Sequence, residues 1–352
     1  EQRDDVAKVE ARCARPDGHG MMITNGTGTG KTYTGMGAIK RFVQAGKKDI
    51  LILAPSDAVI AGWVKTGDAL GVPVYQLRNT KDAGQGVTVT TYANASDNNA
   101  LALRNFDLIV PDEAQNLMSN ADGEPTGNIE ALRAFSMHPR GLGARWDMQH
   151  AEDWAKAKAL PKGDRKDAEM ARLYDQRRAA VEKWATQPRS KVLFLSATPW
   201  AYDKTVDYTE GYLFSYPEDQ RIGNSNQTGR AAFFVQNFGY RIRYHKLTKP
   251  EHAVDSAVFE RDFHEKLKRE GVLSGRSLQL DVDYDRRFVR KDDMDGNRLD
   301  DALEALDNLV RAERDEVAAK QKTAKPGERI PTPFAALQNH MRKNFDYLER
   351  QK

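Results

Sequence analysis

A glycine-rich run, Asn25-Gly26-Thr27-Gly28-Thr29-Gly30-Lys31-Thr32, follows a short apolar segment and precedes a helical pattern. Glycines allow backbone N–H groups to turn inward around phosphate oxygens, and the start of the following helix adds positive potential. A lysine at the end of such a loop reaches the outer phosphates of a nucleotide, and the next hydroxyl ligates Mg²⁺. Asn25 departs from the usual first glycine. The residues predicted to bind phosphate and metal are Thr27, Gly28, Thr29, Gly30, Lys31 and Thr32.

A second motif, Asp-Leu-Ile-Val-Pro-Asp-Glu-Ala-Gln at residues 107–115, is an apolar strand pattern that ends in two carboxylates. At the carboxyl end of a strand, Asp112 is predicted to hold Mg²⁺ and Glu113 to orient and deprotonate an attacking water. Gln115 is placed to sense the γ-phosphate or to couple to a neighbouring motif. The alternative is a solvated helix start. Proline donates no N–H, so Pro111 fits only the last position of the strand.

A third motif, Ser196-Ala197-Thr198-Pro199, follows another apolar strand pattern. Hydroxyls at the carboxyl end of that strand are suited to hydrogen-bond the region of Glu113 and Gln115. Ser196 and Thr198 are therefore predicted to couple hydrolysis to movement of a bound polymer. An ordinary strand-ending turn is the alternative, and this motif in isolation does not exclude it.

The elements that must position these motifs alternate in type along the chain. Strands are predicted at 21–24, 49–54, 87–92, 107–110 and 191–195, the last closing the series, and a helix at 32–45. Short buried strands separated by helices imply a parallel sheet with helices on both faces. The predicted fold class is therefore α/β.

Two further regions do not follow this alternation of strands and helices. Residues 120–190 are predicted to be a helical insertion with two exposed helices over 149–186, interrupted at 161–164, whose aromatic residues Trp154, Tyr174 and Trp184 pack onto the main body. Residues 203–352 are predicted to be a mixed α/β or mainly helical extension, with amphipathic helices over 255–270 and 302–319. Tyr240 to Tyr244 alternates as a strand does, although its basic and aromatic residues also suit a single-stranded nucleic acid.

Composition narrows the classes of function. The 352 residues carry 54 basic and 51 acidic side chains, a net charge of +3, which excludes coating of nucleic acid by bulk charge. One cysteine, Cys13, cannot form an internal disulfide or a thiolate-rich metal site. No apolar run is long enough to span a membrane. We expect a cytoplasmic protein of a bacterial or phage-infected cell and, since the first residue is Glu1, a piece of a longer chain.

The three motifs in this order resemble superfamily-two helicases and translocases of the DEAD/DEAH type, over roughly residues 1–200. More loosely, the chain is similar to strawberry-notch-like helicases of phages and mobile elements. Pro55 and Ser56 resemble the motif after the second strand that contacts the nucleic-acid backbone, and Thr90-Thr91-Tyr92 resembles the next such motif. Gln2 stands where an adenine-recognition glutamine often precedes the loop.

The resemblance implies a first RecA-like domain at residues 1–202, with ATP and Mg²⁺ as ligands and a nucleic-acid strand, DNA more than RNA, across the carboxyl ends of the strands. It also implies a second RecA-like domain, which would supply arginine fingers. The run Gln227-Thr228-Gly229-Arg230 is only superficially like the arginine motif of that domain and is interpreted as a loop. We therefore expect the second domain beyond residue 352.

The sequence thus predicts the motor portion of an ATP-dependent helicase or translocase. A different P-loop NTPase is the first alternative, but a GTPase should carry N-K-x-D, which is absent. The second is a module that binds ATP and nucleic acid without independent catalysis.

Overall fold

The computed structural model describes residues 2–275 apart from Thr27 and residues 119–124, 201–202, 223–224, 244–245 and 249–252. The predicted helix at 302–319 therefore lies outside the described residues, as does the phosphate-loop residue Thr27. A compact unit extends from Glu1 to Gln279. Described residues beyond the predicted boundary near residue 202, such as Phe233 and Phe263, pack on the same core as earlier ones.

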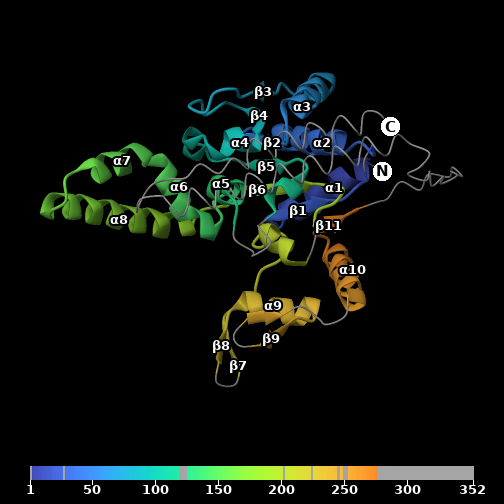
Figure 1. The fold of residues 1–352 in the computed structure, drawn as a ribbon. Helices are drawn as coiled ribbons and strands as arrows, with labels where there is room; N and C mark the ends of the chain where they lie inside the picture. Colours follow the sequence, from blue (N-terminus) through green and yellow to red (C-terminus); the bar gives the residue numbers. More distant parts are fainter. Residues whose placement is uncertain are drawn as a thin grey trace, which may run out of the picture. The chain divides into compact units, whose positions relative to one another are not determined.

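Seven strands form one sheet in the order β11-β1-β6-β5-β2-β4-β3 (Figure 1). Every neighbouring pair in it is parallel, as the alternation of strands and helices predicts. The strands are β1 (Gly20–Ile23), β2 (Ile50–Ala54), β3 (Tyr75–Gln76), β4 (Val87–Thr91), β5 (Leu108–Pro111), β6 (Lys191–Leu195) and β11 (Leu273–Ser274). Pro111 is the last residue of β5, as expected.

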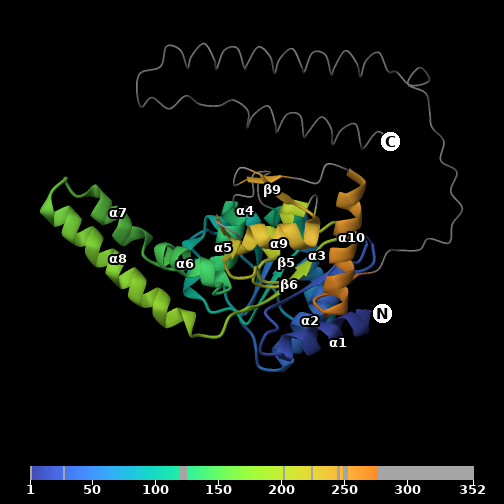
Figure 2. The same cartoon turned by 90° about the horizontal axis from the view of Figure 1, so that it is seen from below.

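Side chains that alternate along the strands pack against helices on both faces of the sheet. On one face, Met21, Ile50 and Leu108 join a core with helices α1 (Gln2–Ala14), α2 (Lys31–Gln44) and α3 (Asp57–Leu70). On the other face, Met22 and Leu51 join a core with α4 (Tyr92–Ser96), α5 (Gly127–Phe135) and the extension. Figure 2 shows the same elements from below.

The helical insertion is built from α6 (Leu142–Gln149), α7 (Ala151–Ala159) and α8 (Asp164–Ala185), with short 3-10 turns η1 (Asn99–Leu103), η2 (Ala114–Leu117) and η3 (Pro139–Gly141) before it. The break between α7 and α8 falls where the sequence predicts it. Trp154 and Trp184 pack with Trp146 and Leu173 into a separate small core, and Tyr174 is 54% exposed. The expectation that these aromatics cover the main body is wrong, because α7 and α8 extend away from the sheet (Figures 1 and 2).

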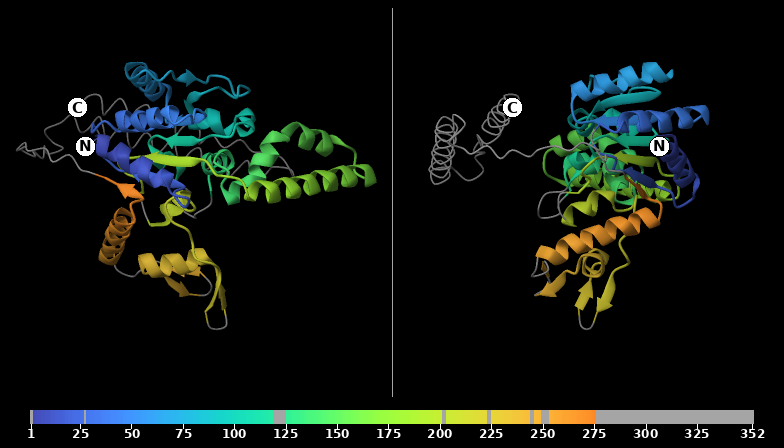
Figure 3. Two further views of the ribbon diagram at one scale, coloured as in Figure 1. Left: turned by 180° about the vertical axis from the view of Figure 1, so that it is seen from behind. Right: turned by 90° about the vertical axis from the view of Figure 1, so that its right-hand side faces the viewer.

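The extension lies on the side of the sheet opposite α2 and α3 (Figure 3). Its elements are η4 (Asp203–Thr209), the hairpins β7 (Gln220–Ile222) with β8 (Ser225–Gln227) and β9 (Arg241–Arg243) with β10 (Lys246–Thr248), and helices α9 (Gly229–Phe238) and α10 (Ala253–Arg269).

Three expectations about the extension are settled by these elements. The strand predicted after Tyr240 is confirmed as β9. The loop predicted around Arg230 is wrong from Gly229 onward, because α9 begins there and buries Phe233 and Phe234. The sheet does not close at β6, because α10 returns the chain and β11 pairs with β1.

No helix within the described residues is both long enough and apolar enough to cross a lipid bilayer.

Candidate nucleotide site and its coupling residues

The three motifs meet at the carboxyl ends of three adjacent strands. The phosphate loop follows β1, the motif of Ser196 follows β6, and Asp112 follows β5. Backbone hydrogen bonds continue past the strands: Ser196 N donates to Ile23 O at 3.1 Å, and Asp112 N donates to Leu53 O at 2.8 Å. Because these ends lie at one edge of a parallel sheet, the sequence-predicted groups share one site.

The phosphate loop has the backbone that the glycines predict. Gly28 and Gly30 have φ angles of 79° and 82°, a region that residues with a side chain rarely adopt. Lys31 is the first residue of α2, and its Nζ donates to the carbonyl oxygens of Asn25 and Gly26 at 3.1 and 3.4 Å. The ammonium thus lies over its own loop, where phosphate oxygens would replace these carbonyls as acceptors.

Asn25, which departs from the usual glycine, has a structural partner. Its Nδ2 donates to Asp5 Oδ2 at 2.9 Å, and Asp5, which is 1% exposed, also accepts from Ser274 Oγ of β11 at 3.1 Å. The side chain of Asn25 therefore joins α1, the phosphate loop and the last strand. The departure at Asn25 is visible in the sequence, whereas nothing in the local sequence of Asp5 distinguishes it.

Gln2 lies beside the phosphate loop, at the start of α1. Its Nε2 donates to Thr29 O at 3.2 Å, and a Cβ on Gly30 would collide with the same amide nitrogen. Gln2 is exposed, so its amide remains accessible to a base bound over the loop. This position agrees with the adenine-contact role that the resemblance implies, and that role stays a prediction.

Asp112 is held from two sides in a buried position. The residue is 5% exposed; its Oδ2 accepts from Trp63 Nε1 at 2.7 Å and its Oδ1 from Glu113 N at 3.0 Å. Burial raises the pKa of Asp112, while the Trp63 hydrogen bond and the charge of Lys31 act in the opposite direction. The carboxylate of Asp112 is therefore desolvated and close enough to Lys31 to be influenced by its charge.

Glu113 and Gln115 form a hydrogen-bonded series with Ser196. Glu113 has a φ of 47°, unusual for a residue with a side chain, and its Oε2 accepts from Gln115 Nε2 at 2.8 Å. Gln115 Oε1 in turn accepts from Ser196 Oγ at 2.6 Å, and Thr198 N donates to that same hydroxyl at 3.1 Å. The contact expected between the second and third motifs is therefore present through the hydroxyl of Ser196, whereas Thr198 supports that hydroxyl with its backbone N–H.

The residues predicted to contact nucleic acid differ in exposure. Ser56 is exposed at the N-terminus of α3, and Pro55 is half-buried. Thr90 is fully buried and accepts from Asn94 Nδ2, and Thr91 Oγ1 accepts from Asn94 N as the cap of α4.

Tyr92 is 6% exposed, and its hydroxyl donates to Asp112 O at 2.8 Å. The side chains of Thr90 and Tyr92 therefore pack in the interior. Ser56 is the most accessible of the five predicted contacts.

Two side-chain oxygen groups at this edge of the sheet are suitable ligands for magnesium. Mg²⁺ prefers hard oxygen ligands and binds through one or two protein groups together with phosphates and water. The hydroxyl of Thr32, at the second residue of α2, and the buried carboxylate of Asp112 are such groups. These residues fit the metal that the resemblance implies.

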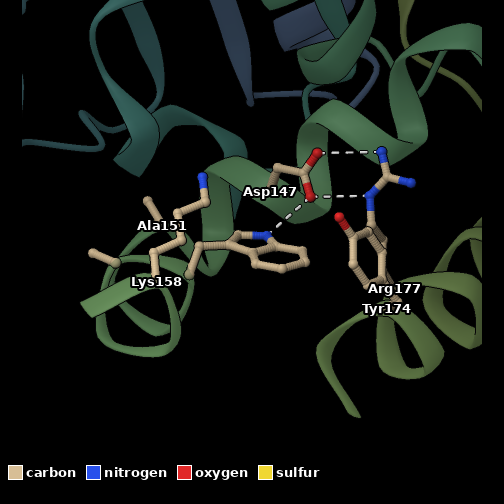
Figure 4. Close-up of a pocket in the computed structure, with 7 residues that line it drawn as sticks. Asp147, Ala151, Lys158, Tyr174 and Arg177 are labelled. Atoms are coloured by element: carbon tan, nitrogen blue, oxygen red, sulfur yellow. Dashed lines mark hydrogen bonds and ion pairs between the residues drawn. The ribbon is translucent and has the colours of Figure 1, made fainter. Parts of the chain in front are cut away.

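A separate cavity of about 610 Å³ lies in the helical insertion. Asp147 accepts hydrogen bonds from Arg177 Nε at 2.9 Å and from Trp154 Nε1 at 3.1 Å. Figure 4 shows Asp147 facing Arg177. These contacts satisfy the charge of Asp147 and hold α6 to α7 and α8. The residues that line the cavity belong to none of the three motifs, so the cavity is distinct from the nucleotide site.

Comparison with known families gives one match. Residues 1–137 match the family described as the type III restriction enzyme, res subunit. This range contains the phosphate loop and the acidic motif but ends before Ser196. No curated protein matches the chain.

Among solved structures, the chain is similar to the SWI2/SNF2 ATPase core of Sulfolobus solfataricus in complex with double-stranded DNA, with 12% identity and a TM-score of 0.44. That match covers 79% of this chain and 43% of the other, so the chain spans less than half the length of that protein. Residues 1–137 are thus similar in sequence to that family, and the two motifs within this range lie at the carboxyl ends of strands of one parallel sheet.

Proposed function

We propose that this chain is the ATP-hydrolysing portion of a nucleic-acid translocase or helicase, with DNA favoured over RNA. The observation that carries the proposal is the hydrogen-bonded series from Glu113 through Gln115 to Ser196 beside the phosphate loop. A plain phosphate-binding domain does not need a carboxylate linked in this way to the end of a neighbouring strand. A motor does, because hydrolysis must be transmitted to the polymer.

The proposed reaction is in-line attack of water on the γ-phosphorus of ATP, which yields ADP and phosphate. Lys31 and the N–H groups of the loop bind the phosphates. Bound Mg²⁺, held by Thr32 and Asp112, would offset the negative charge that develops on the phosphate oxygens. Glu113 orients the water and accepts its proton. Gln115 fixes the Glu113 carboxylate and transmits its position to Ser196.

Full activity is proposed to need a second RecA-like domain in the same longer protein. Such a domain would add a cationic side chain against the γ-phosphate, an effect worth about 10³–10⁵ in rate in related NTPases. Within the described residues, Arg230 does not suit this role, because its guanidinium is bound to Asp207 at 2.6 Å.

The proposal is tested by measuring ATP hydrolysis by the full-length natural protein with and without single- and double-stranded DNA and RNA of equal length. We expect stimulation by DNA, and loss of both basal and stimulated hydrolysis in Lys31→Ala. Lys40→Ala, on the same helix, is a matched control because Lys40 donates to Leu70 O, outside the three motifs. ATP binding without hydrolysis under any nucleic acid would overturn the motor assignment and favour the binding module.

A further inference from the structure

A cavity of about 420 Å³ lies at the edge of the sheet opposite the nucleotide site. Its lining comes from the segments that lead into the strands, including His19 before β1, Asp107 before β5 and Lys191, the first residue of β6. The amino ends of parallel strands share one edge of a sheet, and the three motifs lie at the other edge. The five residues of β6 put about 17 Å between the cavity and Ser196. The two sites are therefore distinct.

Positive side chains dominate the lining of this cavity. Lys47 follows α2, Arg189 follows α8, and Lys191 begins β6, so three separate parts of the chain each contribute a cation. Asp107 is the one carboxylate among the described residues that line the cavity, and its Oδ2 already accepts from Asp49 N at 3.2 Å. The lining thus has a surplus of positive charge.

The cations of the cavity have neutral partners and no counter-ion. Arg189 Nη2 and Lys191 Nζ donate to backbone carbonyl oxygens at 2.9 and 3.3 Å. Within the part of the chain that the structure describes, neither of them nor Lys47 forms an ion pair with a carboxylate. Glu210 influences Arg189, but its ion pair is with Arg140 at 3.2 Å. The surplus of charge is therefore not neutralised by the protein.

The titrating groups at this edge respond to the surplus. Burial, together with the charges of Arg189 and Lys191, lowers the pKa of His19 to about 4. Burial also lowers the pKa of Lys191, and the charge of Lys47 acts in the same direction. Among the described residues, the buried Nδ1 of His19 and Nε of Arg189 have no hydrogen-bond partner. Cations that lie close together repel one another, and an anion between them removes that repulsion.

The backbone around the cavity is fixed by the sheet. Lys191 N donates to Asp107 O at 3.1 Å, and Val192 N donates to His19 O at 3.0 Å. The cationic side chains therefore extend from backbone positions that are set before any ligand arrives. Such preorganisation lowers the cost of ordering a site on binding.

We propose that this cavity binds the phosphate group of a small molecule, either an inorganic phosphate or a nucleotide, through Lys47, Arg189 and Lys191. A phosphate group carries about two negative charges at neutral pH, and its oxygens match the planar fork of an arginine. The volume of the cavity is in the range of small-molecule sites. Phe106 and Met137, which are 4% and 5% exposed, give the cavity an apolar wall. The inference does not depend on the proposed function.

The experiment is isothermal titration calorimetry on the full-length protein carrying Lys31→Ala, a change that weakens phosphate binding at the phosphate loop. The probes are inorganic phosphate, pyrophosphate and AMP, with acetate as a carboxylate for comparison. The variants on this background are Lys47→Gln, Arg189→Gln and Lys191→Gln. Lys48→Gln is the matched control, because Lys48 is exposed next to Lys47 and does not line the cavity.

We expect Arg189→Gln and Lys191→Gln each to weaken binding of the phosphate probes about 10-fold or more, as loss of a hydrogen bond to a charged group does. Lys47→Gln should weaken it about 3- to 10-fold, whereas Lys48→Gln should change it less than about twofold. Tighter binding of AMP than of inorganic phosphate would identify a nucleotide as the source of the phosphate. Tighter binding of inorganic phosphate or pyrophosphate than of AMP would identify the inorganic ion.

The inference is overturned if no phosphate probe binds at millimolar concentrations, or if the cavity variants bind these probes as tightly as Lys48→Gln does. Binding of acetate as tight as that of phosphate would refute the assignment to phosphate. If Arg189→Gln or Lys191→Gln does not fold, as judged by thermal unfolding, Lys47→Gln decides, because Lys47 is exposed. Since no hydrolysis is measured, absence of ATPase activity would refute the proposed function and leave this result unchanged.

Discussion

Ser196 Oγ donates a hydrogen bond of 2.6 Å to Gln115 Oε1, although 81 positions separate the two residues in the sequence. The bond closes a series that begins at Glu113 and ends at the turn after β6. It joins the carboxylate proposed to activate water to the motif proposed to sense the polymer.

Ser196→Ala should reduce DNA-stimulated hydrolysis more than basal hydrolysis. The change removes two hydrogen bonds, to Gln115 Oε1 and from Thr198 N, each worth about 1 kcal/mol, and leaves Gln115 free to reorient. Steady-state ATPase rates across a DNA titration measure the effect. Ser190→Ala is the control, since Ser190 lies just before the opposite end of β6 and its hydroxyl bonds Phe135 O. Equal loss of stimulation in both variants would mean that the effect is general weakening of β6.

Glu113→Gln should lower the hydrolysis rate by about 10²–10⁴ and preserve nucleotide binding. The amide has the shape of the carboxylate but cannot accept a proton from water. Single-turnover hydrolysis and analogue binding, measured on the same sample, separate the two effects. Glu130→Gln, an exposed substitution on α5, should leave both unchanged. A Glu113→Gln protein that hydrolyses ATP at the wild-type rate would show that another group serves as base.

Arg230→Ala should lower the free energy of unfolding by about 2–4 kcal/mol. ATP hydrolysis by the folded variant should not fall, because Arg230 is not expected to act as an arginine finger. Its guanidinium binds both oxygens of Asp207, which is 8% exposed, and removal leaves that carboxylate buried without its cation. Urea unfolding gives the free energy. Arg178→Ala, which breaks the fully exposed pair with Asp175, should cost under about 1 kcal/mol. Unchanged stability together with lost ATPase activity would contradict the structural role.

His138 should make the protein less stable as the pH falls below about 6.5. Burial and the nearby charges of Arg189 and Arg133 lower the pKa of His138 to about 3, so the folded state keeps the ring neutral. The unfolded chain binds a proton below its own pKa of about 6.5. Between these values folding therefore releases a proton, and at pH 5 the loss of stability is about 2 kcal/mol.

The check is the difference in unfolding free energy between pH 7 and pH 5 for the wild type and His138→Asn. Asparagine retains an acceptor for Arg140 N, which now bonds His138 Nδ1 at 3.1 Å. The variant should lose about 2 kcal/mol of that difference. If the free energy of unfolding depended equally on pH in both proteins, groups other than His138 would be the cause.

The sequence alone determined the contiguous parts of the site. The phosphate loop is a local structure, because its glycines, Lys31 and Thr32 act through neighbouring backbone atoms, and its strand–loop–helix context is visible as a change of pattern. The strand of the acidic motif was predictable in the same way, down to Pro111 as its last residue. The alternation of short apolar strands with helices also sufficed to predict a parallel sheet.

Only the tertiary structure decided how these parts are held. Trp63, Tyr92 and Asp5 reach the site from helices whose sequences carry no sign of it, because a hydrogen bond between side chains depends on which strands and helices become neighbours. The two residues of β11 are too few to give a periodic pattern, yet the returning chain places them beside β1. Burial follows from that packing. The side chains of Thr90 and Tyr92 were expected at the surface, but they are buried and support the interior.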